Sequence, residues 1–394
     1  MRIGIDARWI FPELSGIGAY TQELIRALAA LDRRNKYVLL FQRLDVQQRV
    51  RAYAGLDAAP NFRMERVPFG LFSVSNQLRL PGRLRRWGLD VFHSPNYMIP
   101  FGAFPRGGRS RIKCAVTIHD MIPLLHPEWT PRALKTRCLP LFRRLMIEVG
   151  ARADLILTVS DAARQDIGRL LRLSERGAAA VMAVPNGVAS EYRPAGRGAE
   201  PPAGKSEGGA STILYVGRFD PYKNVTGLLR IFARVRALAP GPVRLVLIGA
   251  PDPRYPEAAE LARALGLEPW LRWAGYVAGP DLVRAYQQAD VFVLASKYEG
   301  FGLPVLEAMA CGTPVVCSNT SSLPEVAGDA ALLADPEDIA GFARAIVRVL
   351  AEPALAADLR AKGVRRAAEF TWRRTAEATL QAYEQAVGLP RRQT

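Results

Sequence analysis

The sequence predicts an α/β fold with two doubly wound, Rossmann-like parallel-sheet domains that face a central cleft. The 394 residues, 49% of them hydrophobic, supply enough apolar material for two cores. Short apolar runs bounded by turn residues alternate with amphipathic stretches, the pattern of strands joined by crossover helices. Residues 190–211, dense in Gly, Pro, Ala and Ser, interrupt this alternation, which then restarts. In such domains, ligands bind at the carboxyl ends of the strands.

Each expected strand is a short apolar run that follows a turn. In the first half they are residues 3–6, 37–41, 90–92, 115–118, 154–159 and 180–184. In the second half they are residues 212–216, 245–248, 290–294 and 314–317. After the first strand, Ile17, Tyr20, Leu24, Leu28 and Leu31 recur at three- and four-residue steps, which predicts a helix that buries one stripe.

These elements set the predicted domain boundaries. We expect an N-terminal domain at residues 1–190, a linker at 191–211, a second domain at 212–371, and a helix within 372–394 that crosses back to the first domain. No stretch has the roughly 18–20 uninterrupted apolar residues of a spanning helix, and no signal peptide is evident, so we expect a cytoplasmic protein. Four widely spaced cysteines without a C-x-x-C pair predict reduced, buried thiols and no metal site.

The excess of basic residues is confined to the first half. Residues 1–200 hold 31 basic and 17 acidic residues, and the remainder holds 22 and 20. This asymmetry favours a surface that meets an anionic membrane leaflet, at the inner face of the plasma membrane, or a lipid phosphate, rather than nucleic acid. Composition bias is the competing explanation, because Arg outnumbers Lys 46 to 7. The clusters 79–87 and 132–144 mix cations with Leu, Phe and Trp, as interfacial helices and ordinary solvated helices both do.

Two candidate ligand segments lie in the first half. Gly16 and Gly18 stand between the first strand and its helix, where glycine allows close approach and helix amides favour a phosphate. A tight structural turn would have the same sequence. His119 follows a later strand beside Asp120, and it suits acid-base work or a hydrogen bond to a hydroxyl, although a single histidine there is more often structural.

Two more segments follow strands of the second half. Arg218 and Lys223 lie five residues apart on a strand-to-helix loop and can clamp a diphosphate. A solvated loop that ends in an Asn helix cap would have the same sequence pattern. Glu299 precedes a helix that contains Glu307, and eight helical residues span about 12 Å, so the two carboxylates cannot form an adjacent acid pair. They can instead bind two ends of a long ligand, with the amides near Gly302 and Leu303 as a phosphate seat between them.

Several known constellations are missing from the sequence. It contains no D-x-D, no H-E-x-x-H, no P-loop lysine motif and no G-x-S-x-G elbow. Metal-dependent transfer and serine hydrolysis are therefore poorly supported. A dinucleotide-dependent dehydrogenase is disfavoured because no G-x-G-x-x-G with a following acid comes after the first strand.

Taken together, these motifs resemble the retaining glycosyltransferases of family 4, which have the two-domain GT-B fold. The resemblance covers most of the chain and is carried by MRIGIDARW, SGIGAYTQELIRAL, TIHDMIP, DLILTVSD, VPNGV, LYVGRFDPYKN, SKYEGFGLPVLEAMACGTPVV and SSLPEV. The E-x7-E pair in its Gly-Phe-Gly-Leu-Pro setting is the most specific of these. The sequence is most similar to the mannosyltransferases of bacterial O-antigen and capsule synthesis, but its 190–211 segment and its acceptor side diverge.

The resemblance implies roles for residues of the second domain. It implies that Arg218 and Lys223 hold the donor diphosphate and stabilise the leaving group. Glu299 would contact the hydroxyls of the transferred sugar, and Glu307 the ribose hydroxyls. The backbone of Gly275-Tyr276-Val277 would receive the base.

The resemblance also implies roles in the first domain and an activity. His119 would orient the donor sugar, and Gly16 and Gly18 would reach the phosphates. The implied reaction moves a hexose, best mannose from GDP-mannose, to a saccharide or lipid-linked saccharide without a cofactor or metal. UDP-glucose or UDP-N-acetylglucosamine as donor, a GT-B epimerase, a glycogen-phosphorylase-like enzyme and a non-catalytic binding scaffold are the alternatives.

Overall fold

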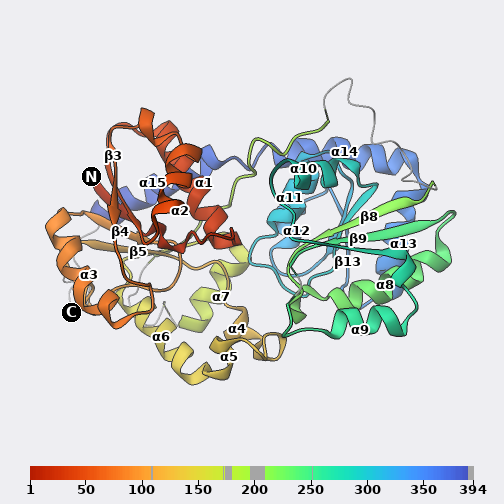
Figure 1. Cartoon of the computed structure of the whole chain (residues 1–394), viewed down its shortest axis with the longest axis horizontal. Helices are drawn as coiled ribbons and strands as arrows, with labels where there is room; N and C mark the ends of the chain where they lie inside the picture. Colours follow the sequence, from red (N-terminus) through yellow and green to blue (C-terminus); the bar gives the residue numbers. More distant parts are fainter. Residues whose placement is uncertain (108–109, 172, 174–179, 196–208, 251, 389–394) are drawn as a thin grey trace. The chain divides into compact units, whose positions relative to one another are not determined.

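The computed structural model divides the chain into two compact units, each built around one parallel sheet (Figure 1). It describes residues 1–107, 110–171, 173, 180–195, 209–250 and 252–388. The first unit comprises Met1–Met121, Cys138–Gly187 and Trp372–Thr394, and the second comprises Ile122–Arg137 and Val188–Thr371.

The first sheet has seven strands in the order β3-β2-β1-β4-β5-β6-β7. They are β1 (Arg2–Ile5), β2 (Lys36–Phe41), β3 (Phe62–Arg66), β4 (Val91–Ser94), β5 (Lys113–Thr117), β6 (Leu155–Thr158) and β7 (Ala180–Ala183). The chain runs outward from β1 to β3 and then returns to β4, so the strand order reverses between β1 and β4. That reversal is where doubly wound sheets open a crevice at their carboxyl edge.

Helices cover both faces of the first sheet (Figure 1). One face carries α1 (Gly16–Leu31), α2 (Leu44–Tyr53) and α15 (Trp372–Gly388), and the other carries α3 (Val74–Trp87), α6 (Leu139–Arg152) and α7 (Asp161–Leu171). Short helical turns connect them: η1 (Ala7–Trp9), η2 (Leu56–Ala58) and η3 (Phe101–Ala103). In α1 the predicted stripe is buried at Tyr20, Leu24 and Leu28, whereas Ile17 and Leu31 are only half-buried.

The second sheet repeats this winding with six strands in the order β10-β9-β8-β11-β12-β13. They are β8 (Ser211–Val216), β9 (Val243–Ile248), β10 (Leu271–Gly275), β11 (Val291–Leu294), β12 (Val315–Ser318) and β13 (Leu332–Ala334). The covering elements are α8 (Val225–Leu238), α9 (Glu257–Ala264), α10 (Gly279–Gln288), α11 (Leu303–Ala310), α12 (Leu323–Ala327), α13 (Ile339–Ala351) and α14 (Pro353–Ala367), with turns η6 (Pro221–Lys223) and η7 (Glu268–Trp270). The predicted pair of doubly wound parallel sheets is confirmed.

Three strands are missing from the sequence-based prediction: β3, β10 and β13. All three lie at an edge of their sheet. Their residues are mostly half-buried or exposed, as in FRMER and LRWAG. An edge strand does not need a continuous apolar run, so the pattern that marks the central strands is weak in these three.

The compact units differ from the predicted domains at one segment. Ile122–Arg137, with α4 (Ile122–Leu125), η4 (Pro127–Trp129) and α5 (Leu134–Arg137), belongs to the second unit although it precedes residue 190. Within that unit, Arg132 pairs with Glu257 at 2.9 Å. Residues 196–208 of the predicted linker lie outside the described part of the chain.

Helix α15 belongs to the first unit. The Tyr383 hydroxyl lies 2.6 Å from His93 Nδ1 in β4, and Thr375 Oγ1 donates to the Pro185 carbonyl at 2.7 Å. These polar contacts, made from a buried helix face, join the end of the chain to the sheet.

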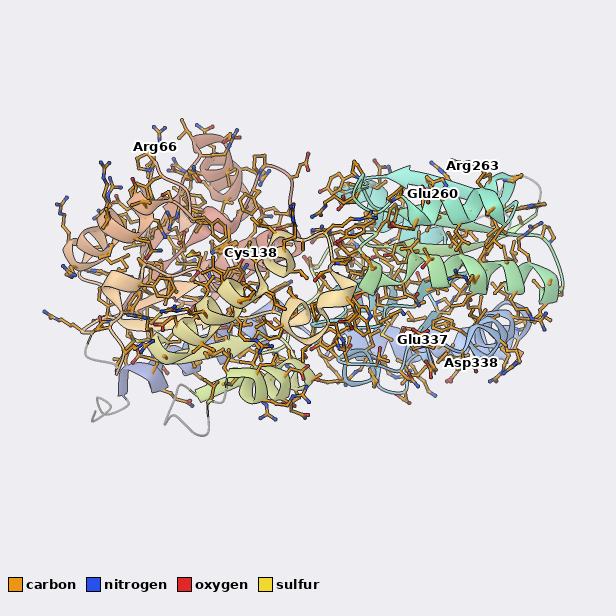
Figure 2. All side chains as sticks on the ribbon, turned by 90° about the horizontal axis from the view of Figure 1, so that it is seen from below. Arg66, Cys138, Glu260, Arg263, Glu337 and Asp338 are labelled. Carbon is orange, nitrogen blue, oxygen red and sulfur yellow. The ribbon has the colours of Figure 1, made fainter. Side chains whose placement is uncertain are left out.

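The structure tests two further expectations, that the cysteines are buried thiols and that no helix spans a membrane. Cys114, Cys311 and Cys317 are buried free thiols, as predicted. Cys138 is exposed (Figure 2), so the expectation of four buried thiols is wrong there, because Cys138 precedes a helix with a polar surface. Among the described residues, no helix has both the length and the apolar character required to span a bilayer.

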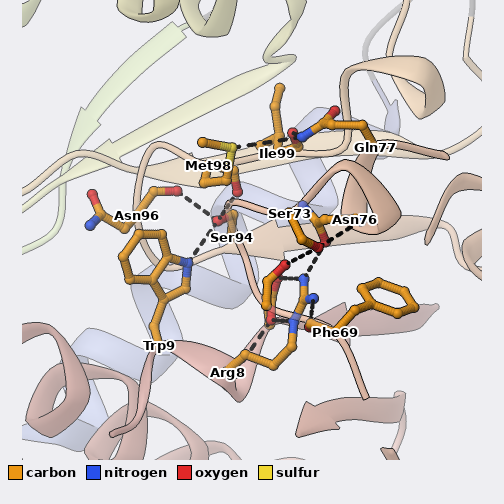
Figure 3. Close-up of polar contacts among 12 residues, drawn as sticks. Arg8, Trp9, Phe69, Ser73, Asn76, Gln77, Ser94, Asn96, Met98 and Ile99 are labelled. Atoms are coloured by element: carbon orange, nitrogen blue, oxygen red, sulfur yellow. Dashed lines mark hydrogen bonds and ion pairs between the residues drawn. The ribbon is translucent and has the colours of Figure 1, made fainter. Parts of the chain in front are cut away.

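A buried ion pair holds the chain at the carboxyl end of β1 (Figure 3). The Arg8 guanidinium donates to both carboxylate oxygens of Asp6, at 2.7 and 2.6 Å, and both side chains are at most 1% exposed. Arg8 also donates to Asn76 Oδ1 at 2.9 Å and to the Phe69 carbonyl at 3.1 Å. Asp6 N donates to the His93 carbonyl at 3.0 Å. The ion pair therefore holds η1 against the start of α3, while the Asp6 backbone amide joins it to β4.

We predict that Asp6→Ala lowers the free energy of unfolding by about 3–5 kcal/mol, because it leaves the Arg8 guanidinium buried without its carboxylate. Urea denaturation measures this effect. The control is Asp45→Ala, which breaks the exposed Arg43–Asp45 pair and is expected to leave the midpoint unchanged. Equal midpoints for the two variants would contradict the prediction.

Candidate active site

The predicted second-domain site residues gather at the carboxyl edge of the second sheet. Residues 217–224 follow β8, Gly275–Val277 ends β10, and Glu299 stands between β11 and α11. Backbone hydrogen bonds join the first two loops through the loop after β9: Gly217 N donates to Ile248 O at 2.9 Å and Gly249 N to Gly275 O at 2.8 Å. A Cβ on Gly249 would lie 1.9 Å from Gly217 O, so only glycine allows this approach.

Lys223 and Glu299 form a largely buried ion pair. Lys223 Nζ lies 2.8 Å from each carboxylate oxygen of Glu299, and the side chains are 13% and 8% exposed. Ser296 Oγ donates to Glu299 Oε1 at 2.7 Å, and Glu299 N donates to Ser321 Oγ at 2.8 Å. The carboxylate is thus oriented by two partners, Lys223 from the loop after β8 and Ser296 from its own loop, while Ser321 holds the Glu299 backbone.

The two cations of the loop after β8 have different partners in this structure. The Arg218 side chain is 64% exposed and pairs with Asp220 at 2.8 Å, with Asp252 further away at 3.8 Å.

Asn224, with φ of 55°, stands at the predicted helix-cap position but does not cap α8 with its side chain. Its amide donates instead to the carbonyls of Ala295 and Pro336, at 3.0 and 3.3 Å. Asn224 therefore ties the Lys223 loop to the end of β11.

The start of α11 can accept an anion. No side chain caps the helix at Gly302, and its first turn contains no acidic residue, which leaves the positive end of the helix dipole at Gly302 and Leu303 uncompensated. Gly302 has φ of 101°, and a Cβ there would lie 2.6 Å from Leu323 Cδ2. Ser322 Oγ donates to the carbonyls of Glu299 and Phe301, at 3.0 and 2.8 Å, and so fixes the preceding loop.

Glu307 has its own set of partners, which the sequence did not reveal. The Tyr286 hydroxyl donates to Glu307 Oε2 at 2.7 Å, and the Tyr192 hydroxyl also bonds this carboxylate. The two tyrosine rings meet edge to face at 5.9 Å. Burial raises the pKa of Glu307 to about 7, against the opposing effect of the two hydroxyls. Tyr192 lies at the start of the predicted linker, so that segment contributes to this cluster.

The base-binding candidates lie at the end of β10. Gly275 has φ of 67°, Tyr276 is 59% exposed, and Val277 is half-buried. These residues therefore lie at the same sheet edge as Glu299, with the Gly275 carbonyl accepting from Gly249 N.

The remaining candidates, Gly16, Gly18 and His119, belong to the first unit. Gly16 is exposed with open space beside its Cα, whereas the Gly18 amide is already bonded to Ser15 Oγ at 3.2 Å. Tyr20, two residues further along α1, meets the His119 ring edge to face at 4.8 Å. The structure therefore brings the glycine loop and His119 into one neighbourhood.

Hydrogen bonding orients His119. Its Nε2 lies 3.0 Å from the Pro95 carbonyl, and because a carbonyl only accepts, this nitrogen carries the proton. His93, in contrast, is fully buried between Thr117 and Tyr383, and burial lowers its pKa to about 3, aided by the nearby His119. His93 is thus a neutral structural residue.

Two family models and several curated proteins match this chain. The description "Glycosyl transferases group 1" matches residues 197–366, and "Glycosyltransferase Family 4" matches residues 14–192. The chain is 32% identical over 383 residues to the O-antigen chain mannosyltransferase B of Escherichia coli, covering 94% of this chain and 96% of the relative. It is 30% identical to a D-inositol 3-phosphate glycosyltransferase of Saccharomonospora viridis, covering 84% and 81%.

Solved structures share the fold. Sucrose-phosphate synthase from Thermosynechococcus elongatus matches with a TM-score of 0.73 at 21% identity, covering 98% of each chain. The HepE protein of Anabaena in complex with UDP-glucose matches with a TM-score of 0.73 at 18% identity, covering 99% and 100%. The chain therefore belongs to the group 1 glycosyltransferases of family 4 and has the GT-B fold.

Proposed function

We propose that this protein is a retaining glycosyltransferase that moves mannose from GDP-mannose to a saccharide or lipid-linked saccharide during bacterial surface polysaccharide synthesis. The observation that carries the proposal is the Lys223–Glu299 pair, a cation and a carboxylate fixed side by side at the ligand edge of the second sheet. The choice of mannose and of polysaccharide synthesis rests on the similarity to the O-antigen mannosyltransferase.

The second unit offers each part of a nucleotide sugar a group of matching chemistry. The ribose hydroxyls donate to the Glu307 carboxylate, and the base meets the backbone at Gly275–Val277. The diphosphate meets Arg218, Lys223 and the first amides of α11, while the sugar hydroxyls donate to Glu299.

Leaving-group stabilisation needs positive charge, which this chain supplies itself. As the bond from the sugar to the diphosphate breaks, negative charge grows on the phosphate oxygen, and the Lys223 ammonium and α11 amides stabilise it. Arg218 can turn toward the same phosphates because its side chain is exposed. We therefore propose transfer without a metal or other cofactor, which an assay in EDTA checks.

Retention follows if donor and acceptor react on one face of the sugar. The sugar C1–O bond to phosphate breaks, the acceptor oxygen bonds C1 from the same side, and the acceptor proton passes to the departing phosphate. Glu299, held by Lys223 and Ser296, stabilises the positive charge on the sugar without attacking it. A covalent sugar adduct on Glu299, or an inverted product, would contradict this step.

Other donors remain candidates within the same fold. HepE has been solved with UDP-glucose, so UDP-glucose and UDP-N-acetylglucosamine are the main alternatives. A non-catalytic scaffold would bind a donor without turning it over.

We predict that the purified protein slowly hydrolyses GDP-mannose, and that Glu299→Gln lowers the rate at least a hundredfold because the sugar loses its carboxylate partner. Nucleotide release from GDP-mannose, UDP-glucose, UDP-galactose, UDP-N-acetylglucosamine and GDP-fucose is the measurement. Lys362→Gln, on the surface of α14, is the control. Turnover of a UDP-sugar alone would change the donor, and unchanged turnover in Glu299→Gln would overturn the site.

The site variants need a folding control. Both residues lie on loops, so the sequence predicts that Lys223→Ala and Glu299→Ala leave the fold intact. Because the pair is largely buried, however, each single change leaves a charge without its partner. The double variant Lys223→Met/Glu299→Gln removes both charges. It is expected to be inactive but more stable than Lys223→Met alone, so thermal unfolding separates loss of chemistry from loss of fold.

Glu307 makes donor affinity depend on pH. Its pKa is raised to about 7, so the carboxylate is mostly protonated at pH 6 and mostly ionised at pH 8. Because the ionised form accepts from the ribose hydroxyls, we predict that the Kd for GDP-mannose falls by up to about tenfold from pH 6 to 8. Glu307→Gln should bind weakly with a flat profile. Tyr286→Phe, which removes a donor to the carboxylate, should move the midpoint upward, and an unmoved midpoint would contradict this assignment.

The start of helix α3 exposes apolar side chains beside cations. Phe72, Val74 and Leu78 are 62%, 73% and 75% exposed, and Val74 and Leu78 lie one turn apart. Exposed cations follow along the helix at Arg79, Arg85 and Arg86. Apolar side chains flanked by cations suit the interface of an anionic bilayer, so we propose peripheral binding through the start of α3.

We predict that Val74→Glu/Leu78→Glu lowers binding to phosphatidylglycerol vesicles at least tenfold, because the acids replace apolar contacts and repel the lipid. Co-sedimentation with vesicles is the measurement, and Leu238→Glu/Leu265→Glu, which adds the same two charges at exposed apolar residues of the second unit, is the matched control. Equal binding by both variants would exclude α3 as the contact.

A further inference from the structure

A basic cavity lies at the amino edge of the first sheet, remote from the carboxyl edge that carries Gly16 and His119. It has a volume of about 760 Å³. It is lined by Arg2, Arg33, Arg34, Asn35, Lys36, Tyr37, Val38, Pro60, Asn61, Arg63, Arg86 and Trp87. Arg2 and Lys36 are the first residues of β1 and β2, and Arg63 is the second residue of β3. Because the strands are parallel, these cations are brought to one edge by the fold itself.

Most of these cations have no carboxylate partner. Arg63 pairs with Glu65, and Arg2 donates to the Trp87 carbonyl at 2.9 Å. Within the described part of the chain, the side chains of Arg33, Arg34, Lys36 and Arg86 form no ion pair, and all four are exposed. Unpaired cations that converge on one hollow repel each other, so an anion placed among them lowers the energy of the folded protein.

The floor of the cavity is rigid. The buried Asp32 carboxylate accepts from the Tyr37 hydroxyl at 2.5 Å and from Asn35 Nδ2 at 2.7 Å. Asn61 Nδ2 donates to the carbonyls of Asp32 and Asn35, at 3.0 and 2.8 Å. This network fixes the turn that carries Arg33 and Arg34. The Asp32 carboxylate is therefore engaged with Tyr37 and Asn35, and it forms no ion pair with the cations of the cavity among the described residues.

We propose that this cavity binds a phosphate-bearing anion at a second site, separate from the nucleotide-sugar site. Arginine forks match phosphate oxygens, and several cations suit a diphosphate or a phosphate next to another charge. Pro60, Val38 and Trp87 add an apolar wall for the organic part of the ligand. Strand β2 has six residues, about 20 Å, so a ligand at the amino edge does not reach the carboxyl edge. The site therefore holds or senses a phosphate rather than reacting with it.

The phosphate has two sources, a lipid headgroup or a soluble phosphorylated compound, which two probes distinguish. Calorimetry with inorganic pyrophosphate, at saturating nucleotide sugar, tests the soluble form. Phosphatidylglycerol vesicles test the headgroup. The variant is Arg33→Gln/Arg34→Gln, and the control is Arg51→Gln/Arg164→Gln, which removes two exposed charges of the same unit elsewhere.

We predict that the cavity variant weakens binding of at least one probe tenfold or more, while the control binds like the unaltered protein. Loss of pyrophosphate binding supports a soluble phosphate, and loss confined to vesicles supports a headgroup. If neither probe distinguishes the cavity variant from the control, the proposal is overturned. The binding measurements do not require donor turnover. A failure of the proposed phosphate site is therefore distinguishable from a failure of the proposed glycosyl transfer.

Discussion

The candidate site depends on one ion pair between two loops that are 76 residues apart in the sequence. Lys223 and Glu299 are largely removed from water, so each would be costly to bury without the other. Their loops are held independently of the pair, by the Asn224 amide on Ala295 and by Ser321 on the Glu299 amide. Under the proposed function, the Lys223 ammonium would donate to the diphosphate while Ser296 keeps Glu299 in position. The carboxylate is thus held in one position at the carboxyl edge of the second sheet.

The hydrophobic pattern was sufficient to predict the central strands and the edge strand β7, but not the edge strands β3, β10 and β13. Strands such as Val291–Leu294 are buried on both faces and are continuous apolar runs. Edge strands such as Leu271–Gly275 have one open side and carry Arg272 and Trp273 outward, so no run marks them. The assignment of Ile122–Arg137 to the second unit was also beyond prediction. It depends on tertiary contacts such as Arg132 with Glu257, which no local pattern encodes.

The site residues could be predicted because the fold sends every strand-end loop to one edge, so the sequence position of Lys223 or Glu299 implies its location. Their partners could not be predicted in the same way. Tyr286 lies 21 residues before Glu307, on another helix, and Tyr192 lies in a segment that reads as a linker. Burial raises the pKa of Glu307 to about 7, and these two hydroxyls oppose that rise. A motif therefore locates a carboxylate, whereas its pKa depends on neighbours that only the tertiary structure supplies.

The structure also divides the basic excess of the first half into groups with different physical roles. Arg8 is buried and structural, and Arg152 donates to the Phe104 carbonyl at 2.8 Å and pairs with Glu148. Such residues need no external anion, and they account for part of the excess without invoking function. Arg33, Arg34 and Lys36 are different, because they are exposed and lie together at the start of β2, where strand pairing also places Arg2 and Arg63. Uniform composition bias would scatter cations over the surface, so this local convergence is the part of the charge that calls for a ligand.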